Sequence, residues 1–174
     1  MESLRDRGAI PGAVAALLHD ADANIINEAG RTLDTLGATE ALPTLRRALK
    51  AEGSDWNRRM IAWVLGNLRD RRSVPLLVSI LKSGNSSALR GEVAEALGNI
   101  GKRSLVVSDA LIESLKDPSP EVRFWAAFSL GKLVEVRALG PLRRLSRQKA
   151  TVPGYWSVGK EARDAIRTIE RASA

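Results

Sequence analysis

The chain has 174 residues, of which 44% are hydrophobic and 27% are charged, and its formal net charge at pH 7 is +7. This length is sufficient for one globular domain or one short repeat array with a buried core. Because the chain has no cysteine, disulfides, thiolate metal sites and a cysteine nucleophile are excluded. The single histidine, His19, cannot build a site of several histidines, so we expect neither a metal nor a cofactor. His19 could act as a general base, but its position favours an exposed side chain at the end of a short helix.

The first residues and the hydropathy pattern predict where the protein resides. No apolar run approaches the roughly 20 residues that a helix needs to cross a bilayer. Residues 1–8 mix acidic and basic side chains and contain no apolar segment. We therefore expect no secretory signal, no membrane span and a cytoplasmic location. The positive charge is compatible with an acidic protein, a nucleic acid or an anionic membrane, and charge alone does not choose among them.

A four-residue phrase with an apolar residue at each end recurs along the chain. It reads Leu-Asp-Thr-Leu at 33–36, Leu-Gly-Asn-Leu at 65–68, Leu-Gly-Asn-Ile at 97–100, Leu-Gly-Lys-Leu at 130–133 and, more weakly, Ile-Arg-Thr-Ile at 166–169. The first residues of successive phrases lie 32, 32, 33 and 36 positions apart. Near-equal steps between phrases of matching residue type indicate internal repeats.

Each phrase ends a stretch with helical spacing. Apolar residues stand eight positions before the phrase, at Ile25, Leu89, Val122 and Val158, and again four positions before it. Such spacing forms one buried helical stripe. A preceding helix is predicted at 40–50, 73–82, 107–116 and 137–147, with Pro43 and Pro75 in the first turn. Asp22, Asp55 and Ser87 stand where an N-cap would open the second helix of a repeat.

These elements predict an all-α protein, specifically an α-solenoid of about five helix pairs with a right-handed superhelix. The predicted repeats lie at 9–36, 40–68, 72–100, 104–133 and 137–172, in a single array over 1–174. No strand pattern appears in the sequence. Polar residues in the last repeat lead us to expect an elongated monomer.

Segment 120–133 carries a family resemblance. Its sequence, Pro-Glu-Val-Arg-Phe-Trp-Ala-Ala-Phe-Ser-Leu-Gly-Lys-Leu, resembles the Val-Arg-x-x-Ala-Ala-x-Ala-Leu-Gly-x-Ile helix of the short HEAT repeats named after phycobilisome lyases. The resemblance covers nearly the whole chain and implies a HEAT-type solenoid. The family includes phycobilin lyase subunits, assembly scaffolds and adaptors, so the resemblance implies no single function. The chain departs from the pattern at Asp34, which replaces the glycine, and at Arg163 and Arg167, which resemble an end cap.

In this repeat type the second helix of each pair is expected to line the concave side. With the first residue of each phrase as position zero, positions −6, −5, −2 and +2 fall outside the buried stripe. Aromatic residues at these positions replace charged or amide side chains of sibling repeats, so we expect the rings to be at least partly exposed. The predicted partner-binding residues are Trp56, Arg59, Met60, Trp63, Asn67, Glu92, Glu95, Asn99, Phe124, Trp125, Phe128, Lys132, Tyr155 and Trp156. The alternative is that neighbouring helices cover the rings as ordinary packing.

Glu92 and Glu95 lie between the two aromatic groups. They suggest a groove with hydrophobic walls and an acidic floor, suited to a protein segment that carries Lys or Arg. A carboxylate pair for catalysis is the less favoured interpretation. An insertion at 149–157 explains the last, longer repeat step, and this loop could either reach over the groove edge or cover the end of the stack.

Basic residues gather elsewhere. Between residues 137 and 160 there are six basic residues and no acidic one. We predict weak contacts without sequence preference between duplex DNA and Arg143, Arg144, Arg147 and Lys149. The alternative is a solvated face that keeps the protein soluble. Arg58, Arg90 and Arg123 share one repeat position, which indicates a structural role in joining adjacent repeats.

The sequence contains no phosphate-binding glycine loop, no dinucleotide fingerprint, no HExxH and no Gly-x-Ser-x-Gly. We therefore expect that the chain is not an enzyme and acts as an adaptor or scaffold that binds another protein or peptide, without a membrane partner. A nucleic-acid-binding protein and a lyase-like or chaperone subunit that handles a tetrapyrrole protein are the alternatives.

Overall fold

The computed structural model describes residues 7–51, 53–84, 86–101 and 103–173. The α-helices are α1 Ala9–His19, α2 Ala23–Thr35, α3 Leu42–Lys50, α4 Asp55–Asn67, α5 Val74–Ser83, α6 Ser87–Ile100, α7 Leu105–Ser114, α8 Pro120–Lys132, α9 Leu139–Leu145 and α10 Val158–Ser173. Short 3₁₀ turns at Thr39–Ala41, Arg71–Ser73 and Val136–Ala138 lead into α3, α5 and α9. Within the described ranges the only β-type pairing is one isolated bridge between Thr151 and Ser157. The predicted all-α solenoid of five helix pairs is confirmed.

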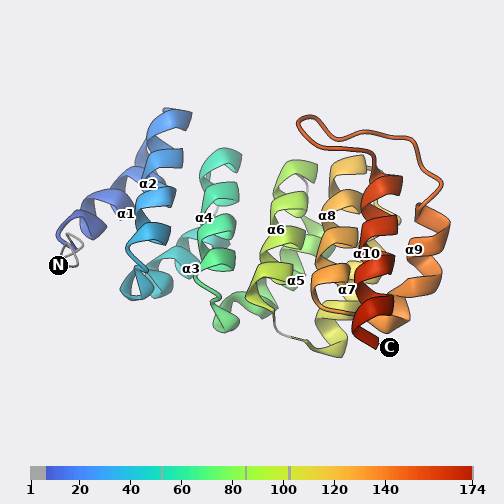
Figure 1. Cartoon of the computed structure of the whole chain (residues 1–174). Coiled ribbons are helices and arrows are strands. Elements are labelled where there is room, and N and C mark those ends of the chain that lie inside the picture. Colours follow the sequence, from blue (N-terminus) through green and yellow to red (C-terminus); the bar gives the residue numbers. More distant parts are fainter. Residues whose placement is uncertain (1–6, 52, 85, 102, 174) are drawn as a thin grey trace, which may run out of the picture.

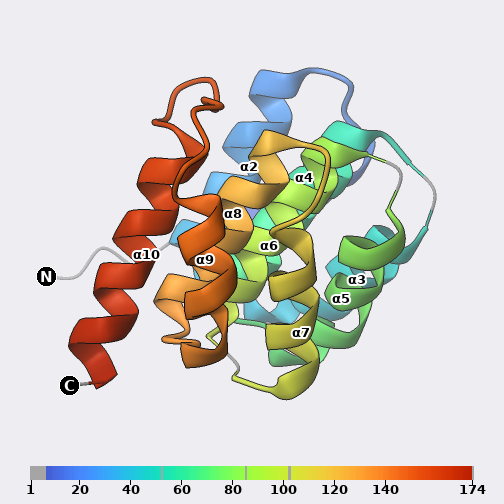
Figure 2. The same cartoon turned by 90° about the vertical axis from the view of Figure 1, so that its right-hand side faces the viewer.

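The helices form two layers, with one member of each pair in each layer (Figures 1 and 2). The inner layer holds α2, α4, α6, α8 and α10, and each of these helices packs on the next. The outer layer holds α1, α3, α5, α7 and α9, which contact one another less closely. Because the inner helices approach one another more closely, their layer lies on the concave side of the stack.

The glycine of the repeated phrase allows this close approach. A Cβ atom added to Gly98 would lie 2.9 Å from Ser129 Cα on α8, and one added to Gly66 would lie 2.8 Å from Ala96 Cα on α6. Real side chains do not tolerate such distances, so only glycine permits this backbone spacing. Where the first repeat carries Asp34 instead, α2 packs less closely on α4.

The leucine of each phrase is buried as predicted, and Leu33, Leu65 and Leu97 are each at most 1% exposed. The predicted burial of Ile25 is wrong, because its side chain is 46% exposed and Ile26 takes the core position instead. Ile26 lies three residues before Ala29, a spacing that also places two side chains on one helical face.

Helix α2 has its predicted N-cap, since the Asp22 carboxylate accepts from the backbone N–H groups of Asn24 and Ile25. The other two N-caps fall one residue earlier than predicted, at Ser54 and Ser86. The Ser86 hydroxyl accepts from the Leu89 N–H and donates to the Asp55 carboxylate at 2.6 Å, so Asp55 joins two repeats instead of capping a helix.

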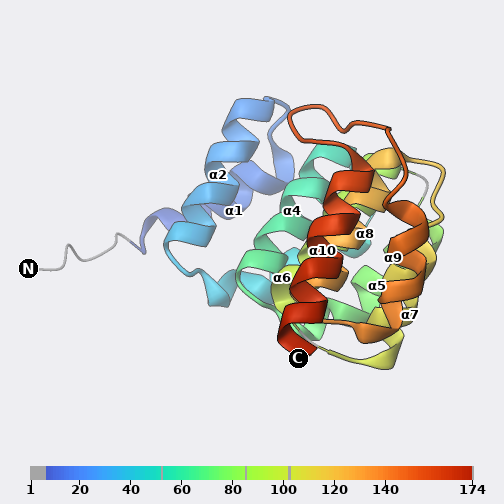
Figure 3. The same ribbon diagram turned by 45° about the vertical axis from the view of Figure 1, so that its right-hand side comes forward.

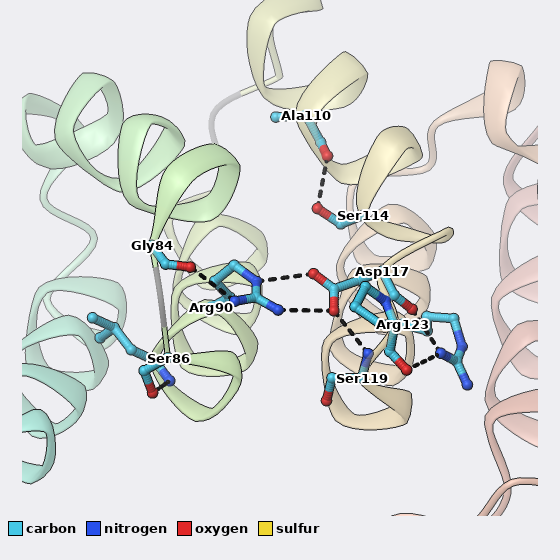
Figure 4. A network of polar contacts seen from close by, with 10 residues as sticks. Gly84, Ser86, Arg90, Ala110, Ser114, Asp117, Ser119 and Arg123 are labelled. Carbon is cyan, nitrogen blue, oxygen red and sulfur yellow. Dashed lines mark hydrogen bonds and ion pairs between the residues drawn. The ribbon is translucent and has the colours of Figure 1, made fainter.

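Two of the three arginines at the shared repeat position, Arg90 and Arg123, join neighbouring turns as predicted (Figure 4), whereas the buried Nε of Arg58 has no hydrogen-bond partner among the described residues. The Arg90 guanidinium donates to both carboxylate oxygens of Asp117 at 2.9 and 3.0 Å and to the carbonyl of Gly84 at 2.8 Å. Arg123 donates to the carbonyl of Asp117 and to the side chain of Gln148 in the following repeat. These bonds fix the position of each repeat on the next.

Candidate functional site

A cavity of about 270 Å³ opens on the inner-helix face between α2, α4 and α6. Its lining residues are Asn27, Arg31, Trp56, Arg59, Met60, Trp63 and Glu92. The structure thus brings together five of the predicted partner-binding residues, and Asn27 and Arg31 occupy the same −6 and −2 positions in the first repeat. We call this space the first cavity.

Charge and aromatic character meet in the first cavity. The Arg59 guanidinium carbon lies 5.0 Å from the centroid of the Trp56 ring, a cation–π contact. A terminal nitrogen of Arg59 lies 3.9 Å from a carboxylate oxygen of Glu92. This is a long ion pair, and within the described part of the chain no hydrogen bond reaches the Glu92 carboxylate. Trp56 is 39% exposed, so its ring is available at the rim.

Rings from α8 and from the loop before α10 form an aromatic cluster. The centroid of the Trp125 ring lies 5.5 Å from that of Phe128, 5.2 Å from that of Phe124 and 5.1 Å from that of Tyr155. Trp156 lies 6.1 Å from Phe124, again between ring centroids. The edge-to-face arrangement of these rings is the favourable one.

Phe124 corrects the prediction that all these rings are at least partly exposed. Its side chain is 1% exposed, because Tyr155 and Trp156 from the loop cover it. Phe124 is therefore core packing and not a partner contact. Trp63, Trp125 and Phe128 keep intermediate exposure, and Tyr155 and Trp156 are half-exposed.

The loop between α9 and α10 reaches over the N-terminal end of α8 at the edge of the inner-helix face (Figures 1 and 3). Within this loop the side chain of Val152 is buried, and the N–H of Val158 donates to the carbonyl of Ala150 at 2.8 Å to close the base of the loop. The Trp156 indole donates to Glu161 at 2.8 Å. Of the two predicted placements for the loop, the structure adopts the one over the groove edge.

Three glutamates gather between the first cavity and the aromatic cluster. Glu92 and Glu95 come from α6, and Glu121 comes from the first turn of α8, where Gly91 lets it approach α6 closely. We call these three residues the acidic patch. Burial raises the pKa of Glu92 to about 7, and the neighbouring charges of Glu95 and Glu121 add to the rise while Arg59 opposes it.

The pKa values of Glu95 and of the nearby Tyr155 are raised as well. Burial raises the pKa of Glu95, and the Asn99 side chain and the charge of Lys132 oppose this shift. The pKa of Tyr155 is raised by burial and by the charges of the three glutamates. Burial and mutual repulsion disfavour the charged forms of these carboxylates, so a cation at the acidic patch would stabilise them.

The predicted residues at position +2 contact one another from repeat to repeat. The Asn67 amide donates to Asp34 and accepts from the Asn99 amide, both at 3.3 Å, and the Lys132 ammonium donates to Asn99 at 2.6 Å. We call this row the polar ladder. It crosses four inner helices, so these side chains serve the joining of repeats.

A second cavity of about 280 Å³ lies between α8 and α10. It is lined by Phe128, Gly131, Lys132, Trp156, Glu161, Asp164, Ala165 and Thr168. Glu161 was predicted to stand at a solvent-facing position but is only 5% exposed, because the loop places Trp156 over it. Burial raises the pKa of Glu161, and the hydrogen bond from Trp156 opposes that shift.

The residues predicted to contact DNA lie on and after α9, away from both cavities. Arg143, Arg144, Arg147 and Lys149 are all exposed. Arg143 forms an ion pair of 2.9 Å with Glu170 of α10, so the acid-free run in the sequence is partly neutralised in space. Contact with DNA through these residues stays a prediction.

Sequence reasoning missed Glu121 and the burial of Glu161, since neither packing contact is encoded in the repeat positions. Among the described residues, no group of three or more His, Cys, Asp and Glu side chains is placed to hold a metal ion. In the same part of the chain, no helix is both long and apolar enough to span a membrane.

Curated relatives of this chain include the deoxyhypusine hydroxylases of Rattus norvegicus and Mus musculus. The rat protein is 35% identical over 92 residues, which cover 52% of this chain and 30% of that protein. The mouse protein is 30% identical over 103 residues, which cover 59% of this chain and 33% of that protein. The chain therefore spans about a third of the length of these relatives. The expectation that the chain is not an enzyme is contradicted, because these relatives are named for an enzymatic activity.

Solved structures show the same fold. A chain from the complex of CpcE and CpcF of phycocyanin lyase from Nostoc sp. PCC7120 superposes with a TM-score of 0.70 at 19% identity, over 97% of this chain and all of that one (100%). The YibA protein of Escherichia coli superposes with a TM-score of 0.59 at 18% identity, over 98% of this chain and 71% of that chain. The first likeness confirms the resemblance to the phycobilisome lyase type of repeat. The sequence model of HEAT repeats matches residues 10–98 and 75–152, which is most of the chain, and the chain therefore belongs to the HEAT-repeat family.

Proposed function

We propose that the chain binds a segment of another protein along its inner-helix face and holds a basic side chain of that segment at the acidic patch. The observation that carries this proposal is that the mostly buried carboxylate of Glu92 lacks a close cation and a hydrogen-bond donor from the described part of the chain. Its carboxylate is mostly buried, its nearest cation is 3.9 Å away, and its pKa is raised to about 7. A lysine or arginine placed beside Glu92 would supply the missing hydrogen bond and the missing charge.

The surroundings of the acidic patch fit an extended segment. The first cavity lies on one side of the patch and the aromatic cluster lies on the other, so apolar side chains that flank the basic one have places to pack. Partly exposed Trp and Tyr rings with a central charged contact are typical of protein-binding surfaces. The phycocyanin lyase structure with the same fold is a complex of two proteins, CpcE and CpcF, which supports a protein as the partner.

A second candidate function is enzymatic. The relatives are named deoxyhypusine hydroxylase, and a carboxylic acid whose pKa lies near 7 can exchange a proton with a bound substrate at neutral pH. On this view Glu92 would act as an acid or base at the inner-helix face. Hydroxylation by dioxygen also consumes two electrons and two protons and releases water, so the test incubates deoxyhypusine with the chain, dioxygen and a two-electron reductant. Mass spectrometry would then look for the gain of one oxygen atom.

Short peptides that differ only at one central residue, Lys, Ala or Glu, test the binding proposal. Titration is followed by the fluorescence of the tryptophans in the first cavity and the aromatic cluster. We expect the Lys series to bind and Glu92→Gln to weaken that binding by about tenfold or more. Glu28→Gln is the matched control, because Glu28 occupies the same −5 position in the first repeat but is exposed on α2. Equal binding of the Lys and Glu series would refute the proposal.

A further inference from the structure

A third cavity, of about 360 Å³, has a composition unlike the other two. It opens where α4, α6 and α8 end, on the side of the stack opposite the loop that precedes α10 (Figure 1). The charged side chains that line it are Arg69, Arg71, Arg103 and Lys132, and none of its lining residues is acidic. We call this space the basic pocket. The protein-binding proposal does not involve it.

The acid nearest in sequence does not neutralise the basic pocket. Asp70 stands between two of the arginines, but its carboxylate is buried and forms an ion pair with Arg46. One of its oxygens accepts from Arg46 at 2.7 Å, and the other accepts from the backbone N–H of Arg72 at 3.3 Å. The positive charges at the pocket therefore repel one another without a carboxylate among them.

Two of the four cations have no role in holding the fold together. Arg103 donates to the carbonyl of Val134 at 3.1 Å, and Lys132 donates to Asn99 in the polar ladder. Across the described ranges, neither a hydrogen bond nor an ion pair engages the guanidinium groups of Arg69 and Arg71. Cations near helix C-termini interact favourably with the helix dipole. Arg69 directly follows the C-cap of α4, so the dipole of that helix offsets part of its repulsion by the other cations.

The backbone at Arg69 adopts a conformation that the repeats share. Arg69 follows α4 with a φ of 52°, in the left-handed region. The equivalent residues are Gly37 after α2, Gly101 after α6 and Val134 after α8, with φ of 60°, 69° and 53°. A glycine adopts this conformation without the steric cost that a larger residue carries. Two repeats therefore accept a side chain at this turn, and Arg69 is the one of the two that places a charge at the pocket.

We infer that the basic pocket binds a phosphate group of a small phosphorylated molecule. Guanidinium groups match phosphate oxygens with paired hydrogen bonds, and two of them are free to turn toward a ligand. The volume exceeds that of a single phosphate, so a diphosphate or a phosphate monoester fits. The three helix ends at the pocket are C-termini, whose dipoles disfavour an anion, so binding rests on the four cations. A concave pocket favours a small molecule over the extended backbone of a nucleic acid.

Isothermal titration calorimetry with the whole chain at low ionic strength tests this inference. The probes are pyrophosphate, inorganic phosphate and adenosine monophosphate, used separately to distinguish a free anion from an ester. We expect one pyrophosphate per chain and a loss of about tenfold or more in affinity for Arg71→Ala. Arg72→Ala is the matched control. It removes the same charge at the next residue, and the Arg72 side chain does not line the pocket. Its affinity should change by less than about twofold.

A second variant separates binding from folding. Arg69→Gly restores the residue that the first and third repeats use, so its melting temperature should be unchanged or higher while pyrophosphate binding weakens. Absence of saturable binding by all three small probes would overturn the inference. So would equal losses for Arg71→Ala and Arg72→Ala, which would reflect net charge alone. Binding of a short DNA duplex that depends on Arg71, without binding of pyrophosphate, would also overturn it in favour of a nucleic acid.

Discussion

Asn67 and Asn99, which occupy the same position in successive repeats, share a hydrogen bond of 3.3 Å from the amide of Asn99 to the side-chain oxygen of Asn67. The bond belongs to the polar ladder, which begins at Asp34 and ends at Lys132. Each rung joins one inner helix to the next, so the ladder stabilises the stacking of neighbouring repeats.

Asn99→Ala should destabilise the chain by roughly 1–2 kcal/mol, because it removes two rungs and leaves the part-buried side-chain oxygen of Asn67 without its donor. Urea unfolding followed by circular dichroism measures this. Asn24→Ala is the control, since Asn24 is exposed in the first turn of α2 and should change stability by less than about 0.5 kcal/mol. Equal effects of the two substitutions would show that the ladder contributes nothing.

Gly98→Ala should destabilise the stack by roughly 1–3 kcal/mol, because the added carbon would lie 2.9 Å from Ser129 Cα and would push α6 away from α8. Gly140→Ala is the matched change at a position where an added carbon meets nothing within 4 Å. In helix α9 it should stabilise by up to about 1 kcal/mol. Thermal melts of the two variants should therefore shift in opposite directions, and a shared direction would argue against close inter-helix packing at Gly98.

Phe124→Ala should cost roughly 3–5 kcal/mol of stability, the usual effect of truncating a buried aromatic residue. Trp56→Ala, which removes a ring that is 39% exposed, should cost clearly less. Chemical denaturation of both variants gives the comparison. If Phe124→Ala were tolerated as well as Trp56→Ala, the loop would not cover Phe124 in solution.

Glu92 should make stability depend on pH. Its pKa is raised from 4.5 to about 7 by burial first and by Glu95 second. Between those values the folded chain holds a proton that the unfolded chain has lost, so the free energy of unfolding falls as pH rises from about 4.5 to about 7 and stays level above that range. Glu92→Gln removes this loss. The variant should match the wild type near pH 4.5 and exceed its stability by roughly 1–3 kcal/mol at pH 8.

Denaturation curves of the wild type and Glu92→Gln at the two pH values test this dependence. A variant that is less stable than the wild type at pH 8 would mean that Arg59 already compensates the carboxylate fully. The acidic patch would then have no uncompensated negative charge for a partner's cation to pair with.

The fold was predictable because the same pattern of buried apolar residues recurs in each repeat. Leu33, Leu65 and Leu97 recur at near-constant spacing, and each is buried. The first cavity was largely predictable for the same reason, since Trp63 and Glu92 occupy solvent-facing repeat positions. Phe124 and Glu161 were not, because both are covered by a loop that interrupts the repeat and whose path is set by contacts distant in sequence. The absence of familiar catalytic motifs did not exclude relatives that are named for an enzymatic activity.

Binding of a lysine-bearing peptide to the wild type, Glu92→Gln and Glu28→Gln, measured at pH 6 and pH 8, tests the role of the inner-helix face most directly. The proposed function predicts that wild-type affinity rises with pH through about 7, as Glu92 ionises. It also predicts that Glu28→Gln behaves like the wild type, whereas Glu92→Gln binds weakly at both pH values. An affinity that is independent of both pH and Glu92 would contradict the account.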